Sequence, residues 1–226
     1  MAARRWLELV NQRHPWNHNE HFHGWVLRNL PARRGLALDV GCGTGVLVEK
    51  LARGFTHVTG IDADERMAAT AGRRLAGNPR VTIHRGRFED YAPTVEDGVF
   101  DLITMVAVLH HLDLEGTLRQ IPRLLGPDGR LLVVGLARAD SVTDVAIDLV
   151  SAAVNPVVGM AKHPRPAGRS PEPADDPLVP PVRPPTTTRA DVARAAATLL
   201  PRSALHRRLF FRYTLRWGKP AVPTER

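Results

Sequence analysis

The fold of this chain is decided by the stretch Leu36-Ala-Leu-Asp-Val-Gly-Cys-Gly-Thr-Gly45. A short apolar strand at residues 36–40 leads into a glycine loop, and an amphipathic helix follows at residues 46–53. In α/β folds this order of strand, loop and helix forms a cradle for a nucleotide-like ligand. The three alternate glycines allow a sharp turn and leave no Cβ between the backbone and such a ligand.

Asp39, at the carboxyl end of the expected strand, narrows the class of ligand. A pyrophosphate normally binds at the helix N-terminus in this place, and a carboxylate there would repel it. A ligand with a cationic group and no phosphate would be attracted instead. The spacing Gly-x-Gly-x-Gly also departs from the Gly-x-Gly-x-x-Gly fingerprint of dinucleotide-binding folds. Both features disfavour a dinucleotide-dependent oxidoreductase.

Strand and helix patterns alternate after the glycine loop. Several of the strand patterns are continuously apolar, which is typical of a parallel sheet covered by helices on both faces. The pattern therefore predicts a doubly wound, Rossmann-like α/β fold. We expect strands at residues 57–61, 81–84, 100–106 and 130–135, helices at residues 65–76 and 114–125, and a turn at residues 126–129.

The flanking segments do not follow this alternation. Short helices are expected at residues 6–10 and 20–30. The proline-rich segment before the sixth strand is interpreted as a lid over the acceptor pocket, with a surface excursion as the alternative. Thr188 and Asp191 predict a capping box for a helix that ends at residue 200. Residues 206–217 predict a half-buried strand, with an aromatic and apolar face (Phe211, Tyr213, Leu215 and Trp217) and a solvated basic face (Arg212, Thr214 and Arg216).

These patterns indicate one domain in four parts. The parts are an N-terminal helical cap at residues 1–34, a cofactor-binding core at 35–140, a lid insertion at 141–187, and a final helix with the C-terminal strands at 188–226.

Composition limits the classes of protein to consider. The chain has 226 residues, a formal net charge of +8 and a single cysteine, Cys42, so a disulfide framework is excluded and a cytoplasmic location is expected. The longest apolar stretch, residues 142–161, contains Asp144 and Asp148, which argues against a membrane span. The positive charge raises nucleic acid as a partner. It consists mainly of scattered arginines, however, which favours solvated surfaces instead.

The glycine loop and the strands that follow it resemble the class I S-adenosylmethionine-dependent methyltransferases, over about residues 36–135. The resemblance implies S-adenosylmethionine as cofactor. It also implies a seven-stranded, mostly parallel sheet in the order 3-2-1-4-5-7-6, with the last strand antiparallel. The residues expected around the cofactor are Asp39, Gly41, Cys42, Gly43, Gly45, Asp62, Ala63, Arg87, Phe88, Met105 and Val106, with Trp16 from the N-terminal segment.

The resemblance also implies roles for some of these residues. Asp39 and the glycines surround the methionine part of the cofactor, and Asp62 accepts hydrogen bonds from the ribose hydroxyls. The alternative for Asp62 is that it only caps the next helix. Met105 and Val106 are expected beside the reactive methyl group.

The segment at residues 86–91 departs from the adenine-edge motif of this family. An acid is common where Arg87 stands, and a guanidinium cannot accept a hydrogen bond from the adenine amino group. That bond must then come from Glu89, Asp90, a backbone carbonyl or water. Phe88 still offers its backbone amide and a flat apolar surface.

Methyl transfer requires mainly position, and a general base only where the nucleophile is protonated. His110 and His111, after the fourth strand, are the candidates for this base, and His110 is favoured. The alternative is that one of them packs against or caps the next helix. His21 and His23 compete for the role from the N-terminal segment.

A metal site is also considered at the N-terminal histidines. His18, His21 and His23, with Glu20, match no usual zinc spacing, and no second cluster completes a site, so no metal is expected.

The sequence thus predicts a methyltransferase that acts on an O, N or C nucleophile of a small molecule. One rival is an RNA or DNA methyltransferase, which the charge favours. The strand end at residues 104–109 lacks the Asn/Asp-Pro-Pro-aromatic signature typical of base amino methylation, which disfavours it. The other rival is a methyltransferase-fold subunit that serves a partner without catalysis, which Asp39, the glycines and Asp62 oppose.

Overall fold

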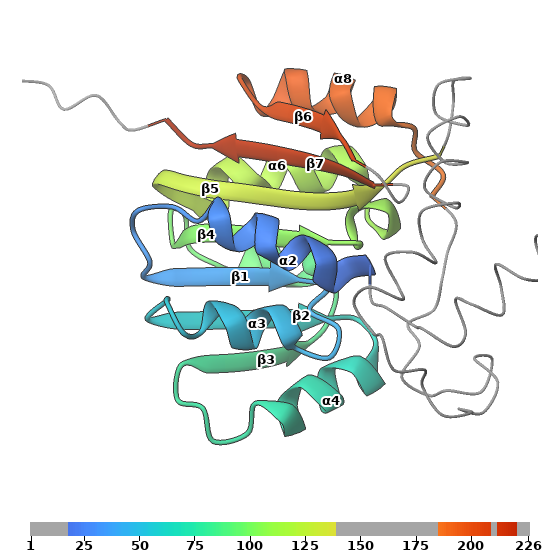
Figure 1. Ribbon diagram of the computed structural model, residues 1–226. Coiled ribbons are helices and arrows are strands. Elements are labelled where there is room, and N and C mark those ends of the chain that lie inside the picture. The colour runs from blue at the N-terminus through green and yellow to red at the C-terminus, as the bar shows by residue number, and fades with distance from the viewer. Residues whose placement is uncertain (1–17, 139–184, 209–211, 221–226) are drawn as a thin grey trace, which may run out of the picture.

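The computed structural model describes residues 18–138, 185–208 and 212–220, with side chains from residue 20 onward. The described residues form a seven-stranded sheet in the order β3-β2-β1-β4-β5-β7-β6, with helices on both faces (Figure 1). This order is the predicted one. The strands are β1 (Leu36–Val40), β2 (His57–Asp62), β3 (Val81–Arg85), β4 (Phe100–Val106), β5 (Leu125–Leu136), β6 (Ala204–Arg207) and β7 (Arg212–Gly218).

The helices begin and end close to the predicted positions. Most predicted helices extend one or two residues too far at the C-terminal end, where the last turn leaves the helical ladder. Thr188 and Asp191 form the predicted capping box at the start of the last helix. The helices are α2 (His18–Arg28), α3 (Val46–Leu51), α4 (Glu65–Arg74), α5 (Phe88–Tyr91), α6 (Leu114–Leu124) and α8 (Arg189–Leu199), with short 3-10 helices η1 (Ala92–Thr94) and η2 (Leu109–His111).

The strands from β3 to β5 run parallel, and β7 is antiparallel to both of its neighbours. Apolar side chains of alternating positions pack on the two faces of the sheet. On one face Ala37, Leu102 and Leu132 pack with α2, α3 and α4. On the other, Leu38 and Ile103 pack with α5, α6 and α8. Both faces of the central strands are therefore buried, which explains their continuously apolar sequence.

The turn predicted at residues 126–129 is wrong. These residues lie inside β5, as a bulge between the pairs Phe100↔Leu125 and Leu102↔Arg130. Asp128 has a φ of 60°, and the bulge is hydrogen-bonded to the end of β7, where the Lys219 N–H donates to the Gly129 carbonyl at 2.9 Å. The local sequence of residues 126–129 favours a turn, but hydrogen bonds to the end of β7 keep these residues in the sheet as a bulge.

The single strand expected at residues 206–217 is two strands, β6 and β7. The exposed basic face expected on it is also partly wrong, because Thr214 is only 1% exposed. Thr214 pairs with Val134, whose side chain packs on the sheet face that α2 covers. Arg216 is exposed as expected and donates to Asn29 Oδ1 at 3.2 Å.

Some predicted features lie outside the described residues. They are the helix at residues 6–10, Trp16, Phe211 and the lid as far as residue 184. Among the described helices, none combines the length and apolar character that a membrane crossing needs.

Candidate functional site

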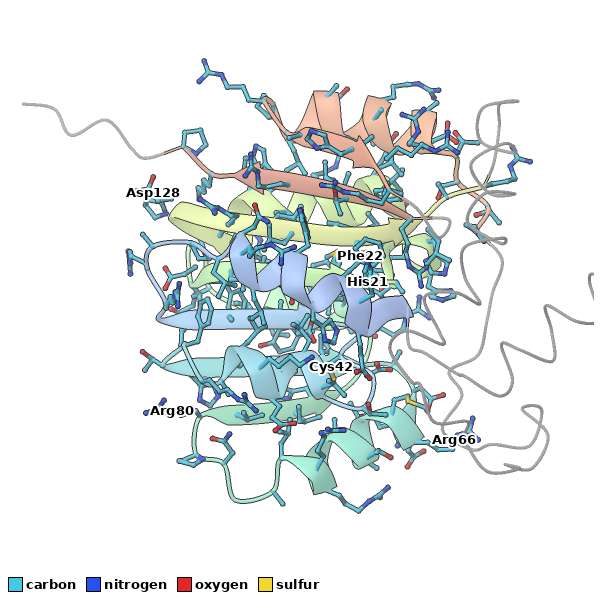
Figure 2. All side chains as sticks on the ribbon, in the orientation of Figure 1. His21, Phe22, Cys42, Arg66, Arg80 and Asp128 are labelled. Atoms are coloured by element: carbon cyan, nitrogen blue, oxygen red, sulfur yellow. The ribbon has the colours of Figure 1, made fainter. Side chains whose placement is uncertain are left out.

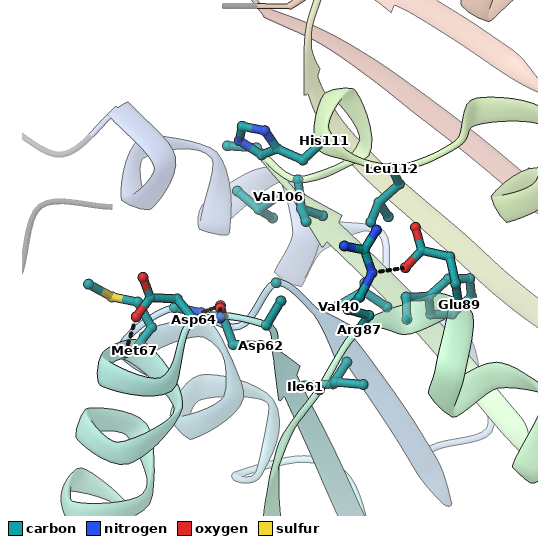
Figure 3. Close-up of a pocket in the computed structure, with 17 residues that line it drawn as sticks. Val40, Ile61, Asp62, Asp64, Met67, Arg87, Glu89, Val106, His111 and Leu112 are labelled. Atoms are coloured by element: carbon teal, nitrogen blue, oxygen red, sulfur yellow. Dashed lines mark hydrogen bonds and ion pairs between the residues drawn. The ribbon is translucent and has the colours of Figure 1, made fainter. Parts of the chain in front are cut away.

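A pocket of about 630 Å³ opens at the carboxyl ends of β1, β2 and β4 (Figure 3). Its position is next to the boundary between β1 and β4, where the strand order reverses, and its volume is within the range of small-molecule sites. It is lined by Val40, Gly41, Gly43, Ile61, Asp62, Ala63, Asp64, Met67, Gly86, Arg87, Phe88, Glu89, Val106, Ala107, Val108, His111 and Leu112.

The glycine loop forms one wall of the pocket. Gly41, Gly43 and Gly45 have φ values of 69°, 54° and 80°, in the left-handed region that favours glycine. A Cβ on Gly41 would lie 2.6 Å from Val108, and one on Gly45 would lie 2.9 Å from Leu75, whereas one on Gly43 would meet nothing within 4 Å. The first and third glycines are therefore needed for packing within the protein. Gly43 leaves its space open on the side of the pocket.

Asp62 joins the end of β2 to the glycine loop. Its carboxylate accepts the backbone N–H of Gly43 at 2.8 Å and that of Asp64 at 2.9 Å. The N-cap of α4 is Asp64, which accepts from the backbone N–H of Arg66 at 2.8 Å and of Met67 at 3.2 Å. Capping thus falls to Asp64, and the remaining lone pairs of Asp62 are available in the pocket wall. Burial raises the pKa of Asp62, and the two backbone hydrogen bonds oppose the rise.

Asp39 lies behind this wall, not in it. The residue is 2% exposed, and Oδ1 accepts a hydrogen bond from Thr104 Oγ1 at 2.6 Å. Burial raises the pKa of Asp39 to about 7, and the Asp62 charge adds to the rise while the Thr104 hydrogen bond opposes it. Two acids close to the loop favour a cationic ligand.

The corner between β3 and α5 forms the opposite side of the pocket in Figure 3, where Arg87 and Glu89 face Asp62 and Asp64 across it. Arg87 is the N-cap of α5, and its Nε lies 3.6 Å from Glu89 Oε2. Phe88 is 3% exposed and supplies an apolar surface.

The segment after β4 completes the pocket. Val106, Ala107 and Val108 line it, and Ala107 has a φ of 57°, which is strained for a residue with a Cβ. Such strain is typical of functional sites. Met105 was expected beside Val106, but its side chain is fully buried in the core and does not line the pocket.

Of the four candidate histidines, His111 lines the pocket and is exposed. The His110 ring lies beside it, with the ring centroids 3.9 Å apart and the rings tilted by 40°, but is not part of the wall. Burial, followed by the charges of His111 and Arg212, lowers the pKa of His110 to about 4. Its Nδ1 is buried without a hydrogen-bond partner among the described residues.

The two candidate histidines of α2 lie apart from the pocket wall. His21 is exposed and contacts Phe22 edge to face (Figure 2). His23 is 6% exposed, its Nδ1 lies 3.2 Å from Lys50 Nζ, and burial lowers its pKa to about 4. Within the described residues, no group of three or more metal-ligating side chains is arranged to hold a metal ion.

Of the remaining residues predicted around the cofactor, some line the pocket and others are buried away from it. Ala63 lines the pocket, whereas Cys42 is buried behind the loop, where burial raises the pKa of its thiol. Several wall residues were not predicted from the sequence, although each lies near the end of a predicted strand. Those missed are Val40, Ile61, Asp64, Met67, Gly86, Ala107, Val108 and Leu112.

Comparison with known proteins finds similarity to methyltransferases. A model described as "Methyltransferase domain" matches residues 38–133, which include β1, the glycine loop and most of β5. An uncharacterized methyltransferase of Mycobacterium tuberculosis (strain ATCC 25618 / H37Rv) is 27% identical over 210 residues, covering 91% of this chain and 98% of the relative. Residues 38–133 form a methyltransferase domain. The match lies on the segments that build the pocket.

Two further similarities are consistent with this methyltransferase family. A ubiquinone biosynthesis O-methyltransferase of Aromatoleum aromaticum is 31% identical over 132 residues, covering 57% of this chain and 56% of the relative. The crystal structure of a SAM dependent methyltransferase from Aquifex aeolicus has a TM-score of 0.57 at 16% identity, and the match covers 87% of this chain and 89% of that one. This likeness shows the shared fold.

The methyltransferase uses S-adenosylmethionine as its cofactor, and the residues of the pocket fit that molecule. The open space at Gly43 allows close approach of a ligand, and Asp62 offers acceptors for hydroxyl groups. Apolar walls at Phe88 and Leu112 suit a flat base.

Proposed function

We propose that this methyltransferase transfers a methyl group to an O, N or C nucleophile of a small molecule, within a single domain whose cofactor-binding core is residues 35–140. The observation that carries the proposal is the pocket itself. One wall is the glycine loop, whose Gly43 N–H donates a hydrogen bond to Asp62, and His111 lines another part of the pocket. The bound cofactor supplies a methyl group that its sulfonium sulfur activates.

In this proposal Asp62 accepts hydrogen bonds from the ribose hydroxyls. The carboxylate is held by two backbone N–H groups, so its orientation is set before the ligand arrives. Gly43 lets the methionine part approach the backbone, and Asp39 attracts the cationic groups of the cofactor when its carboxyl group is ionised. Val106 packs beside the methyl group.

We assign the general base to His111. It is the candidate histidine on the pocket wall, whereas the lowered pKa of His110 makes that ring a poor proton acceptor near neutral pH. When the acceptor atom carries a proton, that proton would pass to His111 as the acceptor takes the methyl group that the sulfonium supplies and the electron pair of the broken carbon–sulfur bond remains on sulfur. The products are the methylated acceptor and S-adenosylhomocysteine.

Support for a small-molecule acceptor comes from the relatives. The similar protein of Aromatoleum aromaticum is named for O-methylation in ubiquinone biosynthesis, which favours a hydroxyl acceptor here. The net charge of +8 favours a nucleic-acid acceptor as the second candidate. Several arginines are paired with acids, however, such as Arg85 with Glu65 at 2.9 Å. Figure 2 shows Arg66 and Arg80 at the periphery, so these charges are dispersed.

The cofactor placement is tested by calorimetry with S-adenosylhomocysteine. Asp62→Ala should weaken binding by about 1–3 kcal/mol, because the ribose hydroxyls lose a charged acceptor. Asp90→Ala is the matched control, since Asp90 is an exposed acid beside the pocket but not in its wall. Equal affinity of wild type and Asp62→Ala would refute the placement.

The acceptor class is tested with methyl-labelled S-adenosylmethionine and a fractionated extract. Label should appear in small molecules and should survive nuclease treatment. Label that is found only in nuclease-sensitive material would establish the nucleic-acid alternative and overturn the small-molecule proposal.

The base assignment is tested once an acceptor is known. His111→Gln should lower kcat by about 10²–10⁴-fold for a protonated nucleophile and leave S-adenosylhomocysteine affinity nearly unchanged. His21→Gln, a change on the exposed surface of α2, should keep wild-type turnover. Full activity of His111→Gln with a hydroxyl acceptor would contradict the assignment.

A further inference from the structure

The adenine end of the pocket lacks the acid that is common in this family at the position of Arg87. An amino group on the base needs an acceptor, and arginine has none. The acidic side chains in the pocket wall are Asp62, Asp64 and Glu89. The first two lie together at the end of β2 and already accept backbone N–H groups of the loop and of α4. Glu89 is on the opposite side in Figure 3.

We propose that Glu89 accepts a hydrogen bond from the 6-amino group of the cofactor's adenine and makes the pocket selective for a 6-aminopurine. The inference rests on the proposed position of the cofactor, with its ribose at Asp62. It assigns a specificity-determining role to a residue two positions beyond the usual acid.

The hydrogen-bonding state of Glu89 points to a ligand. Its Oε2 atom is buried and has no hydrogen-bond partner among the described residues. The ion pair with Arg87 does not satisfy it, because 3.6 Å is too long for a hydrogen bond. Buried carboxyl oxygens in native proteins nearly always have a donor. Glu89 itself lines the pocket, so a small rotation of its side chain on ligand binding would bring this oxygen to a donor on the ligand, which would supply the missing bond.

The neighbouring residues distinguish Glu89 from Asp90, the other acidic side chain that the sequence left open. Asp90, next in the chain, is exposed and does not line the pocket. Arg87 directs its guanidinium toward Glu89, and its side chain is 65% exposed, so the ion pair lies where α5 meets solvent. An arginine at this position is compatible with adenine binding because it orients the acid that replaces the usual one.

The proposed contact also predicts that the pocket discriminates between 6-aminopurines and 6-oxopurines. A 6-oxo group would place an acceptor against the Glu89 carboxyl oxygen, and two acceptors without a proton between them repel each other. A site that hydrogen-bonds a polar group of its ligand rejects analogues that lack the group.

The test uses calorimetry with two ligands, S-adenosylhomocysteine and its analogue in which hydrogen replaces the 6-amino group. Wild type should bind the analogue about tenfold to hundredfold more weakly. Glu89→Ala should lose a similar factor for S-adenosylhomocysteine and should bind the two ligands equally. Asp90→Ala is the matched control and should behave as wild type.

Binding by Asp62→Ala separates the inference from the proposed function. If Asp62→Ala weakens S-adenosylhomocysteine binding while Glu89→Ala still prefers it over the analogue as wild type does, the cofactor site stands and the role of Glu89 is overturned. If Asp62→Ala binds normally, the proposed placement itself fails. The melting temperature of ligand-free Glu89→Ala should equal that of wild type, and a large fall would show that Glu89 serves the fold instead.

Discussion

Replacing Asp39 with asparagine should stabilise the ligand-free protein at alkaline pH and weaken its affinity for a cationic cofactor. Asparagine keeps the shape of the side chain and an oxygen that can accept from Thr104 Oγ1, but it carries no charge. The substitution therefore removes the buried charge while keeping the 2.6 Å hydrogen bond possible.

The magnitude follows from the pKa of Asp39, which burial raises from 3.8 to about 7. Between these values the folded protein holds a proton that the unfolded chain has lost, so the free energy of unfolding falls as pH rises. One pKa unit corresponds to about 1.4 kcal/mol, so the full penalty is about 4 kcal/mol, of which about 2–3 kcal/mol develops between about pH 5 and pH 8.

The assay is urea unfolding of both proteins at these two pH values, with the difference in unfolding free energy compared. The wild-type profile alone is not a test, because His23 and His110 act in the opposite direction. Their pKa values are lowered to about 4, so their contribution to stability is lost as pH falls from about 6.5 through 4. A difference between Asp39→Asn and wild type that stays constant with pH would refute the reasoning.

A second experiment with Asp39→Asn tests whether the Asp39 charge acts on the bound ligand. S-adenosylmethionine carries a sulfonium and S-adenosylhomocysteine does not, so Asp39→Asn should weaken binding of the first more than of the second. Equal losses for the two ligands would show that the Asp39 charge does not reach the sulfur.

Three further substitutions test the loop and the fold. Gly43→Val should abolish binding of S-adenosylhomocysteine, as measured by calorimetry. Gly77→Val is the control, because Gly77 has a φ of 81° and equal space around it but lies outside the pocket, so this variant should bind normally at a similar cost in stability. Normal binding by Gly43→Val would contradict the proposed role of the loop. Gly135→Ala should lower the unfolding free energy by about 1–3 kcal/mol, because the new methyl overlaps the ring of Tyr213, and unchanged urea unfolding would show that the ring can move. Thr188→Ala should cost about 1 kcal/mol by the same assay through loss of the α8 capping box, and no loss would mean that packing alone sets the start of that helix.

Local sequence was sufficient for those parts of the fold that local forces determine. The apolar runs of β1 and β4 predicted their bounds because strands buried on both faces are mostly apolar in sequence. The capping box at Thr188 was predicted because both partners lie within one turn. The bulge in β5 could not be predicted, since its conformation depends on hydrogen bonds to Lys219, far along the chain.

The glycine loop with Asp39 and Asp62 predicted the class of cofactor from the sequence alone, because these residues form a motif that spans two consecutive strand ends. Only the tertiary structure decided which of several adjacent residues line the pocket and which are buried beside it. It placed His111 in the wall and His110 behind it. It also left Glu89, a residue of the wall, with a buried carboxylate oxygen that has no hydrogen-bond partner among the described residues. Adjacent residues differ in this way because burial and hydrogen-bond satisfaction depend on segments that are distant in sequence and meet at the edge of the sheet.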